Sequence, residues 1–114
     1  MQARQGVFKK CLEAPTELLT KNVTIKSIND HGEPIPYREY IHRVLSTKTE
    51  NDFLICAPFV ESNKYAIKGK VQLHVPNSFR NIYETITRER RTNKQKPISL
   101  SKFIVFFLQQ DLKN

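Results

Sequence analysis

Six consecutive large apolar residues, Phe103–Leu108, follow two serines, Ser99 and Ser101, in the last part of the sequence. Serine is a common first residue of helices, because its hydroxyl accepts a hydrogen bond from a free backbone N–H. One face of the predicted helix holds Phe103, Ile104, Phe107, Leu108 and Leu112. Val105 and Phe106 widen that face almost all the way round, and a helix so apolar must be buried on most sides. Because 114 residues build only a modest core, we expect a second subunit to cover part of it.

A strand and a helix are predicted just before this segment. The stretch KVQLHV, residues 70–75, alternates strictly between polar and apolar residues, as a strand with one buried face does. Pro76 ends the strand because proline cannot donate to a ladder. The following apolar residues have helical spacing: Phe79, Ile82, Tyr83 and Ile86. Three arginines, Arg88, Arg90 and Arg91, end this helix and suit the negative end of its dipole.

This order of elements resembles the ribbon-helix-helix family of DNA-binding proteins, of the Arc, MetJ and CopG type. The similar stretches are KVQLHVPNSFRNIYETI and ISLSKFIVFFLQQDL, which together span about residues 70–112. The resemblance implies a dimer in which one strand from each chain pairs antiparallel with the other. It also implies that this two-stranded ribbon enters the major groove of DNA.

The resemblance assigns roles to individual residues. The base-contacting positions are Lys70, Gln72 and His74, where lysine suits guanine and glutamine suits adenine. The phosphate-binding positions are Ser99, Leu100, Ser101 and Lys102 at the start of the second helix, with Arg88, Arg90, Arg91, Lys94 and Lys96 before it. The shared dimer core consists of Val71, Leu73, Val75, Phe103, Ile104, Phe107 and Leu108.

Residues 1–66 are predicted to form a β-rich region that serves in oligomerisation or binds an effector or a protein partner. A short helix over residues 7–19, broken by Pro15, would open it. Short strands follow at residues 23–28, 37–49, 53–56 and 65–67, with a short helix as the alternative for 37–49. Residues 67–114 form the ribbon-helix-helix-like module. The fold class predicted is therefore α+β, with short antiparallel strands before a strand-helix-helix module, in a dimer.

The charge of the chain lies mostly in its second half. Residues 1–57 hold 8 basic and 7 acidic side chains, whereas residues 58–114 hold 11 basic and 4 acidic ones. A basic half beside a balanced half indicates that one end of the protein meets a polyanion. Double-stranded DNA is the polyanion that the family resemblance implies.

Two other function classes stay open. A small basic ribonuclease of the toxin type would use Glu39, His42, Arg43 and Lys48 on a sheet. A β-domain that binds single-stranded DNA or RNA would stack bases on aromatic residues beside lysines; the candidates are Tyr37, Tyr40, Phe53, Phe59 and Tyr65 with Lys64 and Lys68. The histidines and cysteines have no metal-ligand spacing, so we expect no metal, no cofactor and no catalytic site.

The remaining features concern the compartment. The two cysteines, Cys11 and Cys56, are too few for a disulfide scaffold and are expected to stay reduced. No apolar run approaches the roughly 18 residues of a membrane span, and the first residues lack the apolar segment of a signal peptide. We therefore predict a cytoplasmic, nucleoid-associated protein that binds specific DNA sequences as a homodimer or higher oligomer. Its predicted role is that of a transcriptional repressor or of a DNA-organising accessory protein of a plasmid or phage.

Overall fold

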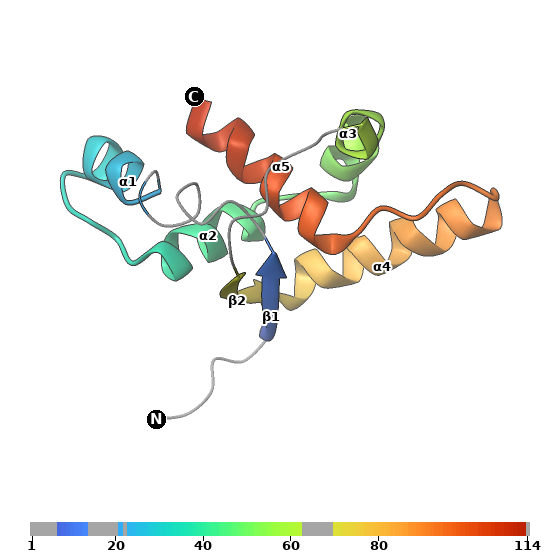
Figure 1. Cartoon of the computed structure of the whole chain (residues 1–114), viewed down its shortest axis with the longest axis horizontal. Coiled ribbons are helices and arrows are strands. Elements are labelled where there is room, and N and C mark those ends of the chain that lie inside the picture. Colours follow the sequence, from blue (N-terminus) through green and yellow to red (C-terminus); the bar gives the residue numbers. More distant parts are fainter. Residues whose placement is uncertain (1–6, 14–20, 22, 63–69, 114) are drawn as a thin grey trace.

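The computed structural model describes residues 7–13, 21, 23–62 and 70–113. Within these ranges the chain forms five helices and two strands (Figure 1). Their order is β1 (Val7–Glu13), α1 (Val23–His31), α2 (Tyr37–Ser46), α3 (Glu50–Ser62), β2 (Lys70–Pro76), α4 (Asn77–Thr92) and α5 (Leu100–Lys113). Helix α1 lies at one end of the molecule, and the turn between α4 and α5 lies at the other.

The prediction of short strands between residues 23 and 56 is wrong, because these residues form helices α1, α2 and α3. In α2 the buried residues Tyr40, Ile41 and Leu45 are spaced by one, four and five residues, so they share one helical face. The apolar run at 53–56 is likewise split by helical geometry, since Phe53 and Cys56 are buried while the residues between them are exposed. Thr49 begins α3 with a capping box, in which its hydroxyl accepts from Asp52 N while Asp52 accepts from Thr49 N. The strand predicted at 65–67 lies outside the described residues.

The predicted first helix and the predicted ribbon are corrected by the same observation. Residues 7–13 form strand β1, which pairs antiparallel with β2 of the same chain. In this register Phe8 lies opposite Val75, and Cys11 lies opposite Gln72. The predicted ribbon pairs this strand with its copy in a second chain, whereas in the structure β2 pairs with β1 of its own chain. The predicted arrangement of N-terminal strands before a strand-helix-helix module is therefore not seen.

A cluster of phenylalanine rings lies at the centre of the core. The centroid of the Phe53 ring, on α3, lies 4.8 Å from the ring centroids of Phe79 on α4 and Phe103 on α5. It lies 5.3 Å from the ring centroid of Phe107 on α5. Six residues of the predicted dimer core are buried within this single chain: Leu73, Val75, Phe103, Ile104, Phe107 and Leu108. The side chain of Val71 lies outside the described part. Helices α2 and α3 supply cover for α5, so its apolar surface does not require a second subunit.

Helices α2 and α5 are also tied by a hydrogen bond, in which the buried Tyr40 hydroxyl donates to the Asp111 carboxylate. Burial, together with this bond, raises the pKa of the Tyr40 phenol well above its ordinary value of 10.0. The folded protein thus holds this proton more tightly than the unfolded chain. The stability gained is complete below pH 10 and is lost as the pH rises above it.

Replacement of Tyr40 by phenylalanine tests this bond. We expect Tyr40→Phe to lower the free energy of unfolding by about 1–2 kcal/mol at pH 7, because a half-buried carboxylate loses its donor. Above pH 10 the wild type should lose stability relative to the variant by about 1.4 kcal/mol per pH unit. Urea unfolding at pH 7 to 11 measures both effects. If the free energies of unfolding of the two proteins changed in parallel with pH across this range, the pKa of the Tyr40 phenol would be the same in the folded and the unfolded protein, which would contradict the prediction.

None of the helices in the described ranges has both the length and the apolar character needed to cross a membrane.

Candidate nucleic-acid interface

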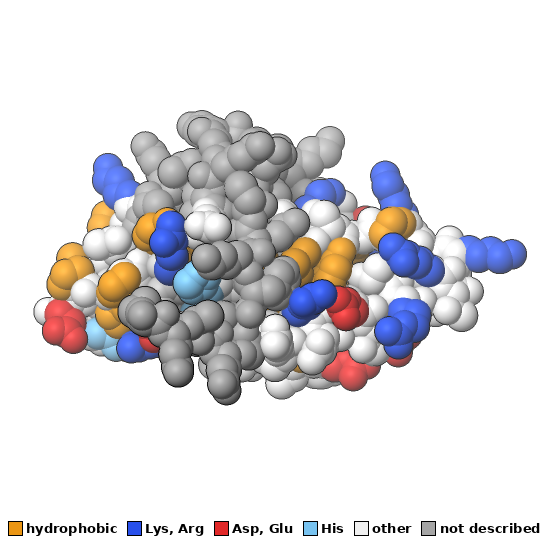
Figure 2. Space-filling view, turned by 90° about the horizontal axis from the view of Figure 1, so that it is seen from below, with side chains coloured by type: hydrophobic (Ala, Val, Ile, Leu, Met, Phe, Trp, Pro, Cys, Tyr) orange, Lys and Arg blue, Asp and Glu red, His pale blue; other side chains and the backbone are white. Residues whose placement is uncertain are grey.

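Four basic side chains gather at the end of the molecule where α4 turns into α5. Arg88 and Arg91 belong to the last turns of α4, and Lys94 and Lys96 to the connection; all four are exposed. We call these four residues the basic end. Figure 2 shows lysine and arginine side chains projecting at this end of the molecule. Within the described part of the chain none of the four has an ion pair, so their charges face solvent.

A Schellman turn closes α4 and presents these side chains. Lys94 N donates to Arg91 O at 3.0 Å, and Gln95 N donates to Arg90 O at 2.8 Å. Lys94 lies in the left-handed region, with a φ of 58°, where glycine is the usual residue. The connection between α4 and α5 therefore begins with a defined turn, and Lys94 occupies the position in that turn where glycine is usual.

Arg90 differs from its neighbours because its side chain is only 11% exposed. Its guanidinium lies 3.2 Å from the Glu61 carboxylate of α3, and its Nε donates to Lys96 O at 2.8 Å. The Tyr83 hydroxyl donates to Ile98 O at 2.8 Å and holds the same connection further along. Arg90 thus fastens the connection to α4 and α3, and we do not include it among the residues free to bind phosphate.

The start of α5 forms a cleft of about 250 Å³ between α3 and the connection, lined by Glu61, Lys96, Pro97, Ile98, Ser99 and Lys102. The Ser99 hydroxyl accepts from Lys102 N at 3.2 Å and so caps the helix. Ser101 is half-buried, and Leu100 is buried in the core. Of the predicted phosphate-binding positions around this cleft, Lys96 and Lys102 supply positive charge, whereas Glu61 opposes an anion.

The three predicted base-contacting residues lie elsewhere. Gln72 is exposed and His74 is half-buried, while the side chain of Lys70 is outside the described part. All three belong to β2, which precedes α4, whereas the basic end lies in the last turns of α4 and in the connection after it. A helix of 16 residues is about 24 Å long, so α4 separates the two groups. The structure therefore does not bring the predicted base contacts and the exposed cations together.

The residues named for the two alternative functions are distributed over the core, the surface and the undescribed part of the chain. Phe59 is exposed and Tyr37 is half-buried, while Lys64, Tyr65 and Lys68 lie outside the described residues. Tyr40 and Phe53 are buried in the core and offer no surface for bases. His42 and Arg43 lie on helix α2 instead of a sheet, and Arg43 pairs with Glu39 at 3.3 Å. Among the described residues no group of three or more His, Cys, Asp or Glu side chains is placed to hold a metal ion.

One surface was missed in the sequence. Leu54, Ile55 and Phe59 of α3 are among the exposed large apolar residues of the described chain. The signal was present in the spacing, because a helix over 50–62 that buries Phe53, Cys56 and Val60 must turn these three residues outward. Interpreting residues 53–56 as a buried strand concealed it.

Comparison of the chain with protein-family models, with curated proteins and with solved structures finds no match.

Proposed function

We propose that this protein binds double-stranded DNA through the basic end, by contacts to phosphates that do not depend on base sequence. The observation that carries the proposal is the gathering of Arg88, Arg91, Lys94 and Lys96 on one exposed end, without acidic partners in the described chain. Each such cation displaces a counterion condensed on DNA, and the release of counterions drives binding. The role is that of a DNA-organising accessory protein, because contacts to phosphates position a protein on DNA but carry no sequence information.

A duplex is favoured over a single strand by the composition of this end. Proteins that bind single strands combine positive charge with exposed aromatic rings on which bases stack. The residues exposed between 91 and 97 are polar, basic or proline, and none is aromatic. The nearest aromatic side chain of α4, Tyr83, is half-buried and donates to Ile98 O. Such a surface suits the regular phosphate backbone of a duplex.

The dependence of binding on salt tests the proposal. With four phosphate contacts, the slope of log K against log salt should be about −3.6 for duplex DNA. Duplexes of unrelated sequence should bind within about threefold of one another, since phosphate contacts carry no sequence information. Fluorescence anisotropy with labelled duplexes of two sequences, and with a single strand, measures these quantities. A slope near zero, or tighter binding of the single strand, would contradict the proposal.

A further inference from the structure

The connection between α4 and α5 carries Lys94 and Lys96 of the basic end, and its backbone is fastened at successive points. The Schellman turn fixes the first of them, Lys94. Arg90 Nε then donates to Lys96 O at 2.8 Å, and the Tyr83 hydroxyl donates to Ile98 O at the same distance. Both lysines therefore project from a backbone that is held in place before a ligand arrives, and such preorganisation lowers the cost of binding.

Arg90 is the side chain that joins this connection to the rest of the protein. Its guanidinium makes two contacts, one to the Lys96 carbonyl and one, at 3.2 Å, to the Glu61 carboxylate of α3. A planar guanidinium presents its donors in a fixed fork and can hold two acceptors at once, whereas a lysine ammonium is a single point charge on a flexible stem. We call the contacts of Arg90 with Glu61 and with Lys96 O the Arg90 clamp.

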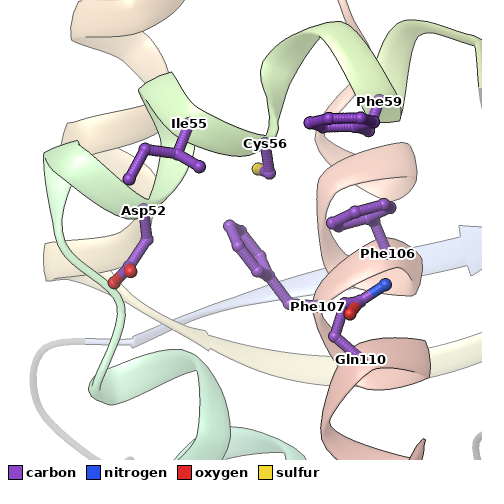
Figure 3. Close-up of a pocket in the computed structure, with 7 residues that line it drawn as sticks. All are labelled: Asp52, Ile55, Cys56, Phe59, Phe106, Phe107 and Gln110. Carbon is purple, nitrogen blue, oxygen red and sulfur yellow. The ribbon is translucent and has the colours of Figure 1, made fainter.

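The helix that supplies Glu61 to the Arg90 clamp is packed firmly into the core. Glu61 follows Val60, which is fully buried. On the same helix the ring of Phe53 packs against rings of α4 and α5. Figure 3 shows that the ring of Phe107 points from α5 toward α3. A carboxylate on such a helix is a fixed point outside α4, so the place of the connection depends on the packing of α3.

We propose that Arg90 is a positioning residue that makes the basic end selective for duplex over single-stranded DNA, an inference that rests on the DNA binding proposed above. The phosphates of a duplex have a regular spacing, so cations on a fixed backbone bind them without an ordering cost to the protein. A single strand is flexible and follows the cations in whatever arrangement they take. Loosening the Arg90 clamp therefore costs affinity for the duplex and spares affinity for the single strand.

Two substitutions that keep the net charge at +8 test the proposal. Arg90→Lys should weaken duplex binding roughly tenfold, which corresponds to ordering about one loop residue on binding. Arg91→Lys makes the same change at the exposed neighbour and should leave duplex binding within about twofold, because the number of charges facing phosphates is unchanged. Fluorescence anisotropy with a duplex and a single strand measures the ratio of the two affinities, which should fall only in Arg90→Lys. Circular dichroism establishes that both variants remain folded.

A second pair of substitutions raises the net charge from +8 to +9 and separates position from charge. Glu89→Ala removes an exposed carboxylate next to Arg90 in the chain, one that makes no ion pair within the described residues. It should tighten duplex binding roughly twofold, because a charge that repels phosphates is lost. Glu61→Ala removes an acceptor of the Arg90 clamp and should weaken duplex binding at least roughly threefold, because the ordering cost outweighs the same gain in charge.

The outcomes distinguish this proposal from the proposed function. Equal duplex affinities of Arg90→Lys and Arg91→Lys, in a protein that binds duplex with the expected salt slope, would overturn the positioning role and leave DNA binding intact. Tighter duplex binding by Glu61→Ala would refute the positioning role in the same way. Equal losses of duplex and single-strand affinity in Arg90→Lys would refute the selectivity. A wild type that does not bind duplex would overturn DNA binding, and the selectivity with it.

Discussion

Phe53→Ala should lower the free energy of unfolding by about 3–5 kcal/mol, which is a large part of the stability of a small domain. The ring is fully buried and contacts Phe79 of α4 and Phe103 and Phe107 of α5. Its removal opens a cavity at the place where α3, α4 and α5 meet. The loss therefore includes ring–ring contacts as well as the transfer of apolar surface out of water.

Urea unfolding at a single protein concentration, followed by circular dichroism, measures this effect. Ile25→Ala is the control, because it removes an apolar side chain that is already about half exposed. It should change the free energy of unfolding by less than about 0.5 kcal/mol. If both variants lost stability equally, Phe53 would not be the centre of the core.

Removal of the basic end should abolish most binding of duplex DNA. The variant Arg88→Gln, Arg91→Gln, Lys94→Gln, Lys96→Gln should bind roughly a thousandfold more weakly at 0.1 M salt, since each lost contact takes about 0.9 from the salt slope. The slope itself should fall close to zero. These side chains are exposed and have no ion pair within the described chain, so the fold should tolerate their replacement.

A matched variant separates position from net charge. Replacing Lys21, Lys26, Arg38 and Arg43 by glutamine also lowers the net charge from +8 to +4, but in α1, in α2 and just before α1. This control should retain most of the affinity and most of the salt slope, because charges far from the contact are largely screened at 0.1 M salt. Similar losses in the two variants would mean that overall charge, and not the basic end, drives binding.

The first half of the chain was mispredicted because its apolar spacings suit more than one structure. Ile41, Val44 and Leu45 fit a helix and can be fitted to a strand, and the run at 53–56 satisfies a buried strand as well as one turn of helix. The gaps between them contain turn residues that also begin helices, such as Thr49 and Asp52. Burial against β2, α4 and α5 decided in favour of helices, and none of those contacts is local in sequence.

The candidate site was predictable in part. The excess of basic residues after residue 58 pointed to a polyanion, and the four exposed cations of the basic end come from that half. Which of the basic side chains are free of acidic partners, and so able to contact phosphates, was not predictable from the sequence. Arg90 and Arg91 are neighbours, yet only Arg90 meets Glu61, which lies 29 residues earlier in the chain and is brought close by the packing of α3 on α4.

The sequence by itself determined which face of each later element is buried. The alternation at 70–75 buries Leu73 and Val75, and the helical spacing at 79–86 buries Phe79 and Ile86, because side-chain direction follows directly from backbone periodicity. Only the tertiary structure decided which strand pairs with β2. Periodicity determines the buried face but leaves both hydrogen-bonding edges open to any strand, and β1, more than 50 residues away in the chain, pairs along one of them. Because this pairing joins segments so distant in the chain, no local pattern in residues 70–75 could have predicted it.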